Sequence, residues 1–240
     1  MDFRVEDKYI VYEDEIAYLR IQLMQVCERD AHSGEDGYLI RSVYFDDISD
    51  SALFENEAGV DERSKFRIRT YDRDSSFIRL EEKSKKSGYT RKESAVIRKD
   101  TVLDLIKDKG ALYSACRSSA SLLAEEGFLF KKLYTCMNTK LLRPVNIVEY
   151  EREAFVERAG NVRITFDRNI GASDDVERFF DKDIHAVPVM ERGAHILEVK
   201  YDEFLPDHIR NIIDKGSLQR TAFSKYTMAR KWREQNGECL

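Results

Sequence analysis

The feature that most constrains the fold is a strict alternation of charged and apolar residues in several short segments. In segment 65–69 (Lys-Phe-Arg-Ile-Arg) the basic residues occupy one parity and the apolar residues the other, and segment 197–201 (Leu-Glu-Val-Lys-Tyr) repeats the pattern. Successive side chains of a β-strand point to opposite faces, so this period of two predicts strands with one charged and one apolar face. Segment 163–167 alternates in the same way, and segments 4–8 and 79–83 each carry three charged residues at one parity.

The order of expected elements favours an antiparallel architecture. Strands are expected at 3–12, 38–46, 64–72, 77–85, 89–98, 145–156, 161–168 and 194–202. Helices are expected at 13–29, 101–109, 117–138 with a break at Gly127, 207–215 and 221–235, and a short helix with a loop within 49–62. Strands and helices do not alternate regularly, which argues against a doubly wound parallel sheet. The expected fold class is α+β, an antiparallel β barrel with helices packed outside, formed by a single domain over residues 1–240.

Composition excludes several classes of protein. An aromatic content of 11% argues against disorder, and no run of 18 apolar residues exists that could form a membrane-spanning helix. The first residues lack the apolar stretch of a signal peptide. The four cysteines are scattered without a CxxC pair, which indicates reduced thiols and argues against a zinc site. We therefore expect a cytoplasmic protein.

The net charge of −5, from 40 basic and 45 acidic residues, gives no overall sign of a polyanionic partner. The basic residues nevertheless gather at one parity of the alternating segments. One interpretation is an antiparallel sheet with one solvated face. The other is a barrel whose charged side lines a lumen, where like charges would be tolerated only around an anion. Arginine and lysine suit phosphate oxygens, and glutamates among them could hold a divalent cation.

The charged segments belong to a series of short motifs. In chain order they are Arg4-x-Glu6-x-Lys8-Tyr9, Ser42-Val-Tyr-Phe-Asp46, Lys65-x-Arg67-x-Arg69, Leu80-Glu81-x-Lys83, Glu149-Tyr150-x-Arg152, Arg163-x-Thr165-x-Asp167, Glu198-x-Lys200-Tyr201 and Ser224-Lys225-Tyr226. The series resembles the catalytic domain of the vacuolar transporter chaperone (VTC) complex, a polyphosphate polymerase. That domain belongs to the triphosphate tunnel metalloenzymes of the CYTH-like superfamily. The resemblance covers about residues 2–233, as a stand-alone domain of bacterial type.

The resemblance implies an antiparallel tunnel barrel that transfers the ATP γ-phosphate to a growing polyphosphate chain with Mn²⁺ or Mg²⁺. The implied catalytic residues are Lys8, Arg67, Arg69, Lys83 and Lys200. The resemblance also implies phosphate binding by Arg152, Arg163, Lys225 and either Arg91 or Lys92, of which we favour Lys92. Strand parity adds Arg4, Lys65 and Arg79 to this phosphate-binding set. The implied metal ligands are Glu198, Glu81 and Glu6. Phosphoryl transfer needs positioning and neutralised charge more than a protein nucleophile, and this basic set could provide both.

One departure from the family pattern bears on the reaction. The CYTH signature has glutamate where this chain has Arg4, which exchanges a metal ligand for a phosphate binder and favours a polymerase. Two alternatives stay open: a tunnel triphosphatase that hydrolyses tripolyphosphate or a nucleoside triphosphate, and a non-catalytic domain that binds polyphosphate or nucleotide. Expected partners are ATP and polyphosphate, with no nucleic acid and no membrane insertion of this chain. A separate membrane protein is a further possible partner.

Two expectations concern individual side chains. Glu149, Glu151 and Glu153 share one parity and would form either a solvated edge or secondary metal ligands. Replacing Arg67 and Arg69 by alanine should abolish phosphate-chain binding without unfolding the protein, because mutual repulsion falls.

Overall fold

The computed structural model describes residues 4–34, 37–107, 127–215 and 218–236. Its strands belong to one antiparallel sheet with the order β11-β1-β10-β8-β7-β3-β4-β5-β6, to which β2 and β9 add short pairings with β7 and β8. Contacts within the chain separate two compact units. Unit 1 comprises Met1–Leu39, Glu149–Gly171 and Pro188–Ser224, and unit 2 comprises Ile40–Val148, Ala172–Val187 and Lys225–Leu240.

The elements have the following bounds in the described part of the chain. The strands are β1 Val5–Tyr12, β2 Glu28–Arg29, β3 Tyr38–Asp46, β4 Arg63–Tyr71, β5 Asp74–Lys86, β6 Tyr89–Ile97, β7 Arg143–Glu157, β8 Val162–Ser173, β9 Val187–Pro188, β10 Ala194–Tyr201 and β11 Gln219–Arg220. The helices are α1 Glu13–Val26, α2 Ser51–Glu57, α3 Lys99–Lys107, α5 Phe128–Thr139, α6 Asp207–Asp214 and α7 Lys225–Asn236, with 3-10 turns at Ala159–Asn161 and Val176–Arg178.

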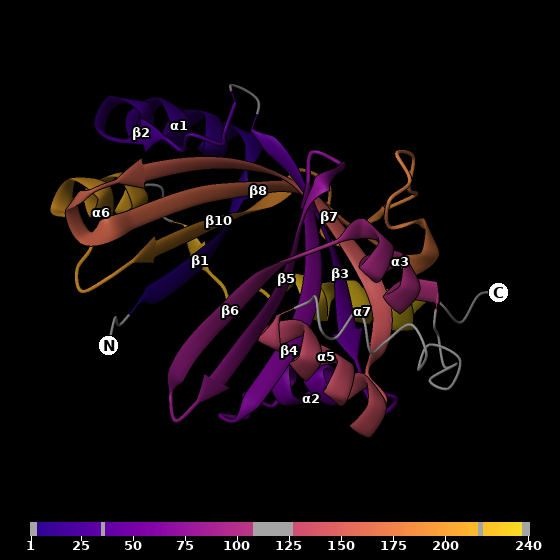
Figure 1. The fold of residues 1–240 in the computed structure, drawn as a ribbon. Helices are drawn as coiled ribbons and strands as arrows, with labels where there is room; N and C mark the ends of the chain where they lie inside the picture. Colours follow the sequence, from indigo (N-terminus) through magenta and orange to yellow (C-terminus); the bar gives the residue numbers. More distant parts are fainter. Residues whose placement is uncertain (1–3, 35–36, 108–126, 216–217, 237–240) are drawn as a thin grey trace. The chain divides into compact units, whose positions relative to one another are not determined.

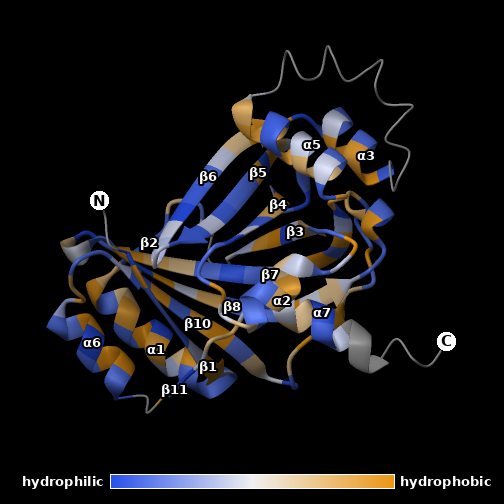
Figure 2. Cartoon of the chain, turned by 90° about the horizontal axis from the view of Figure 1, so that it is seen from below, coloured by the Kyte–Doolittle hydropathy of each residue, from blue (hydrophilic) through white to orange (hydrophobic). Residues whose placement is uncertain are grey.

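Helices α1 and α6 cover the apolar face of unit 1 (Figure 1). Leu19 and Leu23 of α1 pack with Ile164 and Leu197 of the sheet and with Ile209 of α6, and each of these side chains is at most 1% exposed. Both helices carry hydrophilic as well as hydrophobic residues, as amphipathic helices do (Figure 2). The alternation of the sequence therefore directs the apolar parity of these strands toward the helices and leaves the charged parity on the other face.

In unit 2, helices α3 and α5 cover the apolar face of the sheet in the same way (Figure 1). Phe66, Ile68 and Leu80 pack with Val102 of α3 and Leu133 of α5 in one core. The turn from β4 to β5 places Asp72 and Arg73 at φ 49° and 57°, the left-handed conformation that tight hairpins require. The register shifts between Tyr71 and Arg69, so this turn and the irregularity beside it together decide which residues of the two strands face each other.

The predicted elements agree with the structure except at some boundaries. Residues 28–29, expected at the end of the first helix, form β2 and pair with β7. The last helix begins at Lys225 and not at 221, because Gln219 and Arg220 pair with β1. Strand β8 continues to Ser173, beyond the expected end at 168. The first part of the helix expected at 117–138 lies outside the described residues.

Among the described helices, none is long and apolar enough to cross a membrane.

Candidate functional site

Seven charged side chains at one parity of β4, β5 and β6 form the unit 2 charged face. They are Lys65, Arg67, Arg69, Arg79, Glu81, Lys83 and Lys92. The strand register places Lys65 opposite Lys83 and Lys83 opposite Lys92, so three lysines form one row across adjacent strands. Like charges directly opposite each other destabilise a sheet, and a bound anion would relieve this cost.

Glu81 is the buried counter-charge of this face. It is 2% exposed, and its carboxylate lies 2.6 Å from Arg67 Nε, 3.9 Å from Arg69 Nη1 and in contact with Lys92 Nζ. Burial alone would raise the pKa of the Glu81 carboxyl, but the three cations outweigh it and hold the pKa well below its usual range. Glu81 thus stays ionised and fixes the directions of the basic side chains.

Tyr44 of β3 lies beside the same cations. The register places it opposite Arg67, whose Nη1 donates to the phenol oxygen at 3.3 Å, and its side chain is 3% exposed. Burial would raise the pKa of Tyr44, but Arg67, Arg69 and Lys65 outweigh it and lower the pKa to about 8. Tyr44 is therefore a buried phenol that ionises unusually easily.

The motifs around Asp46 and Tyr226 join within unit 2. The Asp46 carboxylate accepts hydrogen bonds from the backbone N–H of Ala52 and Leu53 at the start of α2, and from the Tyr226 hydroxyl. Lys65 Nζ lies 5.8 Å from the centre of the Tyr226 ring. This network fixes the beginning of α7, whose first residue is Lys225. The Lys225 assignment itself stays a prediction.

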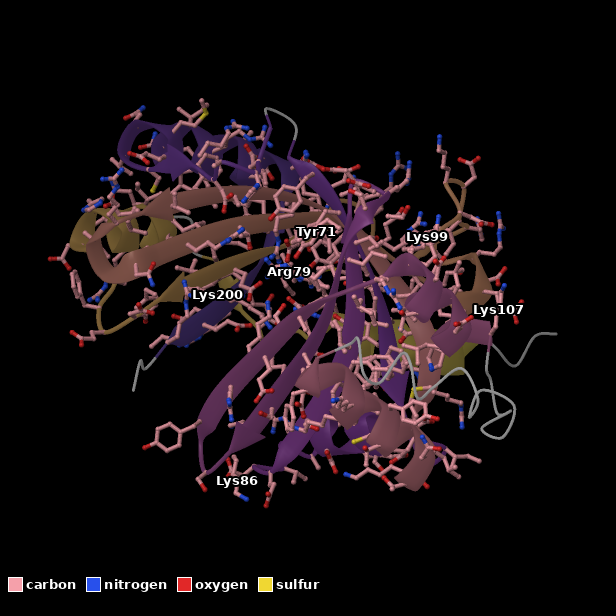
Figure 3. All side chains as sticks on the ribbon, viewed as in Figure 1. Tyr71, Arg79, Lys86, Lys99, Lys107 and Lys200 are labelled. Atoms are coloured by element: carbon pink, nitrogen blue, oxygen red, sulfur yellow. The ribbon has the colours of Figure 1, made fainter. Side chains whose placement is uncertain are left out.

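The unit 1 charged face consists of side chains from β1, β7, β8 and β10. They are Glu6, Lys8, Arg152, Arg163, Asp167, Glu198 and Lys200. The register places Lys8 opposite Glu198 and Glu6 opposite Lys200. Lys200, labelled in Figure 3, has its Nζ 2.6 Å from Glu198 Oε1 and 3.9 Å from Glu6 Oε2. These four residues therefore alternate in charge across two neighbouring strands.

Two predicted phosphate binders of unit 1 are already engaged. Arg152 donates from Nε and Nη2 to the two oxygens of Asp167, at 2.6 and 2.7 Å, and its Nη2 lies 3.4 Å from Glu198 Oε2. Arg163 lies 2.9 Å from Asp30 and donates to the Tyr38 hydroxyl at 3.2 Å. The aspartates thus hold both guanidinium groups in fixed directions, which is the preorganisation that anion binding needs.

The remaining predicted binders lie at the margins of the two faces. Arg4 is exposed and interacts with Asp202 at 3.8 Å. The guanidinium carbon of Arg79, a residue labelled in Figure 3, lies 5.1 Å from the centre of the Phe77 ring. Lys8, by contrast, is inside the unit 1 face, where it lies 3.0 Å from Glu6 and donates to the Phe223 carbonyl at 3.0 Å.

The family resemblance implies a divalent cation, and the positions of the acidic side chains indicate which of them could bind it. In the described residues no three acidic, histidine or cysteine side chains gather into a metal-binding group. Glu6 and Glu198 are nevertheless diagonal neighbours on β1 and β10. Mg²⁺ is commonly held by one or two carboxylates together with substrate phosphates. Glu6 and Glu198 therefore fit a cation that arrives bound to the substrate phosphates, and they do not fit a metal held entirely by protein ligands. Glu81 is instead surrounded by basic side chains.

Sequence reasoning missed the partners that arrive from distant parts of the chain. Asp30, from the segment after β2, meets Arg163, and Tyr44 of β3 meets Arg67. Glu153 does not lie in a solvated edge, which was one of its two expected roles: it is 1% exposed and pairs with Arg20 of α1 and Arg29 of β2 at 2.7 and 3.2 Å. The one sequence signal for this burial is position: Glu153 follows Arg152 on the strand, so its side chain points to the face opposite the charged one.

Solved structures share the fold at low sequence identity. HpAC1 from Hippeastrum has a TM-score of 0.56 and 12% identity, over 97% of this chain and 96% of that one. A candidate adenylate cyclase from Vibrio parahaemolyticus has a TM-score of 0.51 and 12% identity, covering 94% and 97%. The protein PH1819 from Pyrococcus horikoshii has a TM-score of 0.50 and 14% identity, covering 96% and 100%. These likenesses confirm the predicted fold class.

Comparison at the level of sequence gives the family. The curated proteins contain no match to this chain. The family profile described as the VTC domain matches residues 3–232, nearly the whole length, and so confirms the resemblance found in the motifs. The chain is a member of the VTC domain family.

Proposed function

We propose that this chain is a polyphosphate polymerase that transfers the ATP γ-phosphate to a growing polyphosphate chain. The observation that carries the proposal is the row of Lys65, Lys83 and Lys92 across three adjacent strands. An oligophosphate carries negative charge at short, regular intervals and would neutralise such a row. Membership of the VTC domain family and the fixed guanidinium groups of Arg67 and Arg152 support the same substrate class.

The side chains would act by positioning and by charge stabilisation. Phosphoryl transfer passes through a transition state with charge spread over the phosphoryl oxygens, so preorganised cations are the main catalytic requirement. Arg67 and Arg69 would bind phosphate oxygens while Glu81 keeps their directions fixed. Lys8 and Lys200 would do the same in unit 1, between Glu6 and Glu198. Glu198 and Glu6 would hold Mn²⁺ or Mg²⁺, which when bound would neutralise phosphate charge.

A triphosphatase is the second candidate. The structure of HpAC1 is reported with a dominant triphosphatase activity, and this chain shares its fold. Both reactions need the same anion-binding faces, and they differ in whether water or a phosphate chain accepts the phosphoryl group. ATP and polyphosphate remain the proposed partners. A location in the cytoplasm and a separate membrane protein as partner also remain proposals.

The test is an assay with ATP and Mn²⁺, with and without a pyrophosphate primer. A polymerase yields ADP and a ladder of polyphosphate, whereas a triphosphatase yields free phosphate from ATP or tripolyphosphate without a ladder. Binding without any turnover would indicate a non-catalytic polyphosphate-binding domain and overturn both candidates. Lys65→Ala with Lys83→Ala should abolish the product. The matched control is Lys86→Ala, also on β5, because Lys86 pairs at the exposed surface with Glu62 at 2.7 Å (Figure 3).

A further inference from the structure

Thr165 of β8 carries a buried hydroxyl that the proposed chemistry does not use. The residue is 3% exposed, and within the described part of the chain its Oγ1 has no hydrogen-bond partner. A buried polar group without a partner lowers stability, and a valine of the same shape would avoid this cost. Its neighbours Ile164 and Phe166 already pack in the core of unit 1, so packing alone does not require a hydroxyl here.

The register brings this hydroxyl to one particular carboxylate. Thr165 lies directly opposite Glu198 on β10, and both have the parity of the unit 1 charged face. Side chains directly opposite on antiparallel strands have Cβ atoms about 4.5–5.5 Å apart, which a threonine hydroxyl and a carboxylate can span with one hydrogen bond. A change in the direction of the Glu198 side chain is therefore enough to bring the two groups together.

The partners of Glu198 include two cations that a phosphate chain would attract. Oε1 of Glu198 lies 2.6 Å from Lys200, and Oε2 is held by Arg152 at the long distance of 3.4 Å. When phosphate oxygens recruit these cations, Glu198 loses their hydrogen bonds. A hydroxyl donor opposite Glu198 would then help to direct the carboxylate toward a divalent cation.

We infer that Thr165 is a positioning residue, whose hydroxyl donates a hydrogen bond to Glu198 in the state with phosphate and divalent cation bound. The inference rests on the proposed function, because it needs a phosphate ligand to draw the cations away. The hydroxyl then orients one carboxylate oxygen and leaves the other for the metal. Partners of metal ligands commonly act in this way, and their loss typically weakens metal affinity by about 10–100-fold.

The experiment measures the gain in affinity that Mn²⁺ gives to a ligand that cannot be cleaved. Calorimetry determines the Kd of imidotriphosphate, once with EDTA and once with Mn²⁺, for the wild type, Thr165→Val and Thr165→Ser. We expect Thr165→Val to bind like the wild type in EDTA but to lose about tenfold or more of the Mn²⁺-dependent gain. Thr165→Ser should recover the gain. Thr70→Val, which alters a buried threonine of unit 2, should leave it unchanged.

A thermal unfolding measurement without ligand separates this role from a structural one. We expect the Tm of Thr165→Val to be equal to or above that of the wild type, because the hydroxyl is unpartnered in this state. An unchanged Mn²⁺ gain in Thr165→Val, a weaker Kd in EDTA, or a serine variant that behaves like valine would each overturn the inference. A wild type that does not bind imidotriphosphate at all would instead overturn the proposed function, and the inference with it.

Discussion

Arg67 and Glu81 form an ion pair across β4 and β5, with 2.6 Å between Nε and Oε2, and the carboxylate is almost completely buried. Two charges removed from water in this way depend on each other, since the loss of one leaves the other uncompensated. The pair therefore couples the stability of unit 2 to the same arginine that is proposed to bind phosphate.

This coupling changes the expectation for Arg67→Ala with Arg69→Ala. Imidotriphosphate binding should be lost, as the sequence indicated. Stability should not rise, however, but fall by roughly 2–4 kcal/mol, because among the described residues Lys92 would be the one cation left beside Glu81. Urea denaturation measures the loss, and adding Glu81→Gln should recover most of the stability without restoring binding. Unchanged stability in the double variant would contradict the role given to this ion pair.

Glu81 and Glu198 are expected to differ in their response to neutralisation. In Glu198→Gln the gain in imidotriphosphate affinity that Mn²⁺ provides should fall by at least about tenfold, because the proposed metal ligand is lost. In Glu81→Gln that gain should persist, since three cations enclose this carboxylate. Calorimetry with EDTA and with Mn²⁺ distinguishes the two. A loss of the Mn²⁺ gain in Glu81→Gln would restore Glu81 as a metal ligand.

The alternating segments predict which residues of one strand share a charged face, because the alternation of side chains along a strand depends only on the local sequence. Lys65, Arg67 and Arg69 had to share a face once residues 63–71 formed a strand. The row of Lys65, Lys83 and Lys92 depends in addition on register. The register between β4 and β5 depends on the left-handed turn at Asp72–Arg73 and on a register shift between Arg69 and Tyr71, and the alternating pattern predicts neither of them.

Partners that come from distant segments could not be predicted in this way. The side chains that neutralise Glu153 come from α1 and β2, more than a hundred residues earlier in the chain. Similarly, the pairing of Gln219 and Arg220 with Tyr9 and Ile10 delays the start of α7, although the local pattern is helical. In both cases contacts between distant segments determine the outcome: the burial of Glu153 in the first case and the first residue of α7 in the second.

Tyr44 should make the stability of the protein depend on pH. Its pKa is about 8 in the folded chain and 10 as the ordinary value, so the folded state favours the phenolate. The resulting stabilisation is absent below about pH 8, grows between pH 8 and 10, and is complete above pH 10. The wild type should therefore gain up to about 2–3 kcal/mol relative to Tyr44→Phe over this interval.

Urea denaturation of the wild type and Tyr44→Phe across this pH interval provides the test, with tyrosinate absorbance as a second readout. Tyr18→Phe is the control, because Tyr18 is 44% exposed. Imidotriphosphate binding should also weaken more steeply with pH in the wild type than in Tyr44→Phe, because the phenolate cancels one positive charge of the face. If the stability of the two proteins changes with pH in parallel, the neighbouring cations do not lower the pKa of Tyr44.

Glu153 should be needed for stability and not for metal or phosphate binding. Its carboxylate is buried between Arg20 and Arg29, so Glu153→Gln leaves two guanidinium groups without their counter-charge and should cost about 3 kcal/mol. Glu151→Gln is the control on the same strand: the Glu151 side chain is 44% exposed and lies 3.7 Å from Arg168, and its replacement should change stability by less than about 1 kcal/mol. Both variants should keep the wild-type Kd for imidotriphosphate with and without Mn²⁺. A loss of Mn²⁺ dependence in Glu153→Gln without a loss of stability would identify Glu153 as a metal ligand instead.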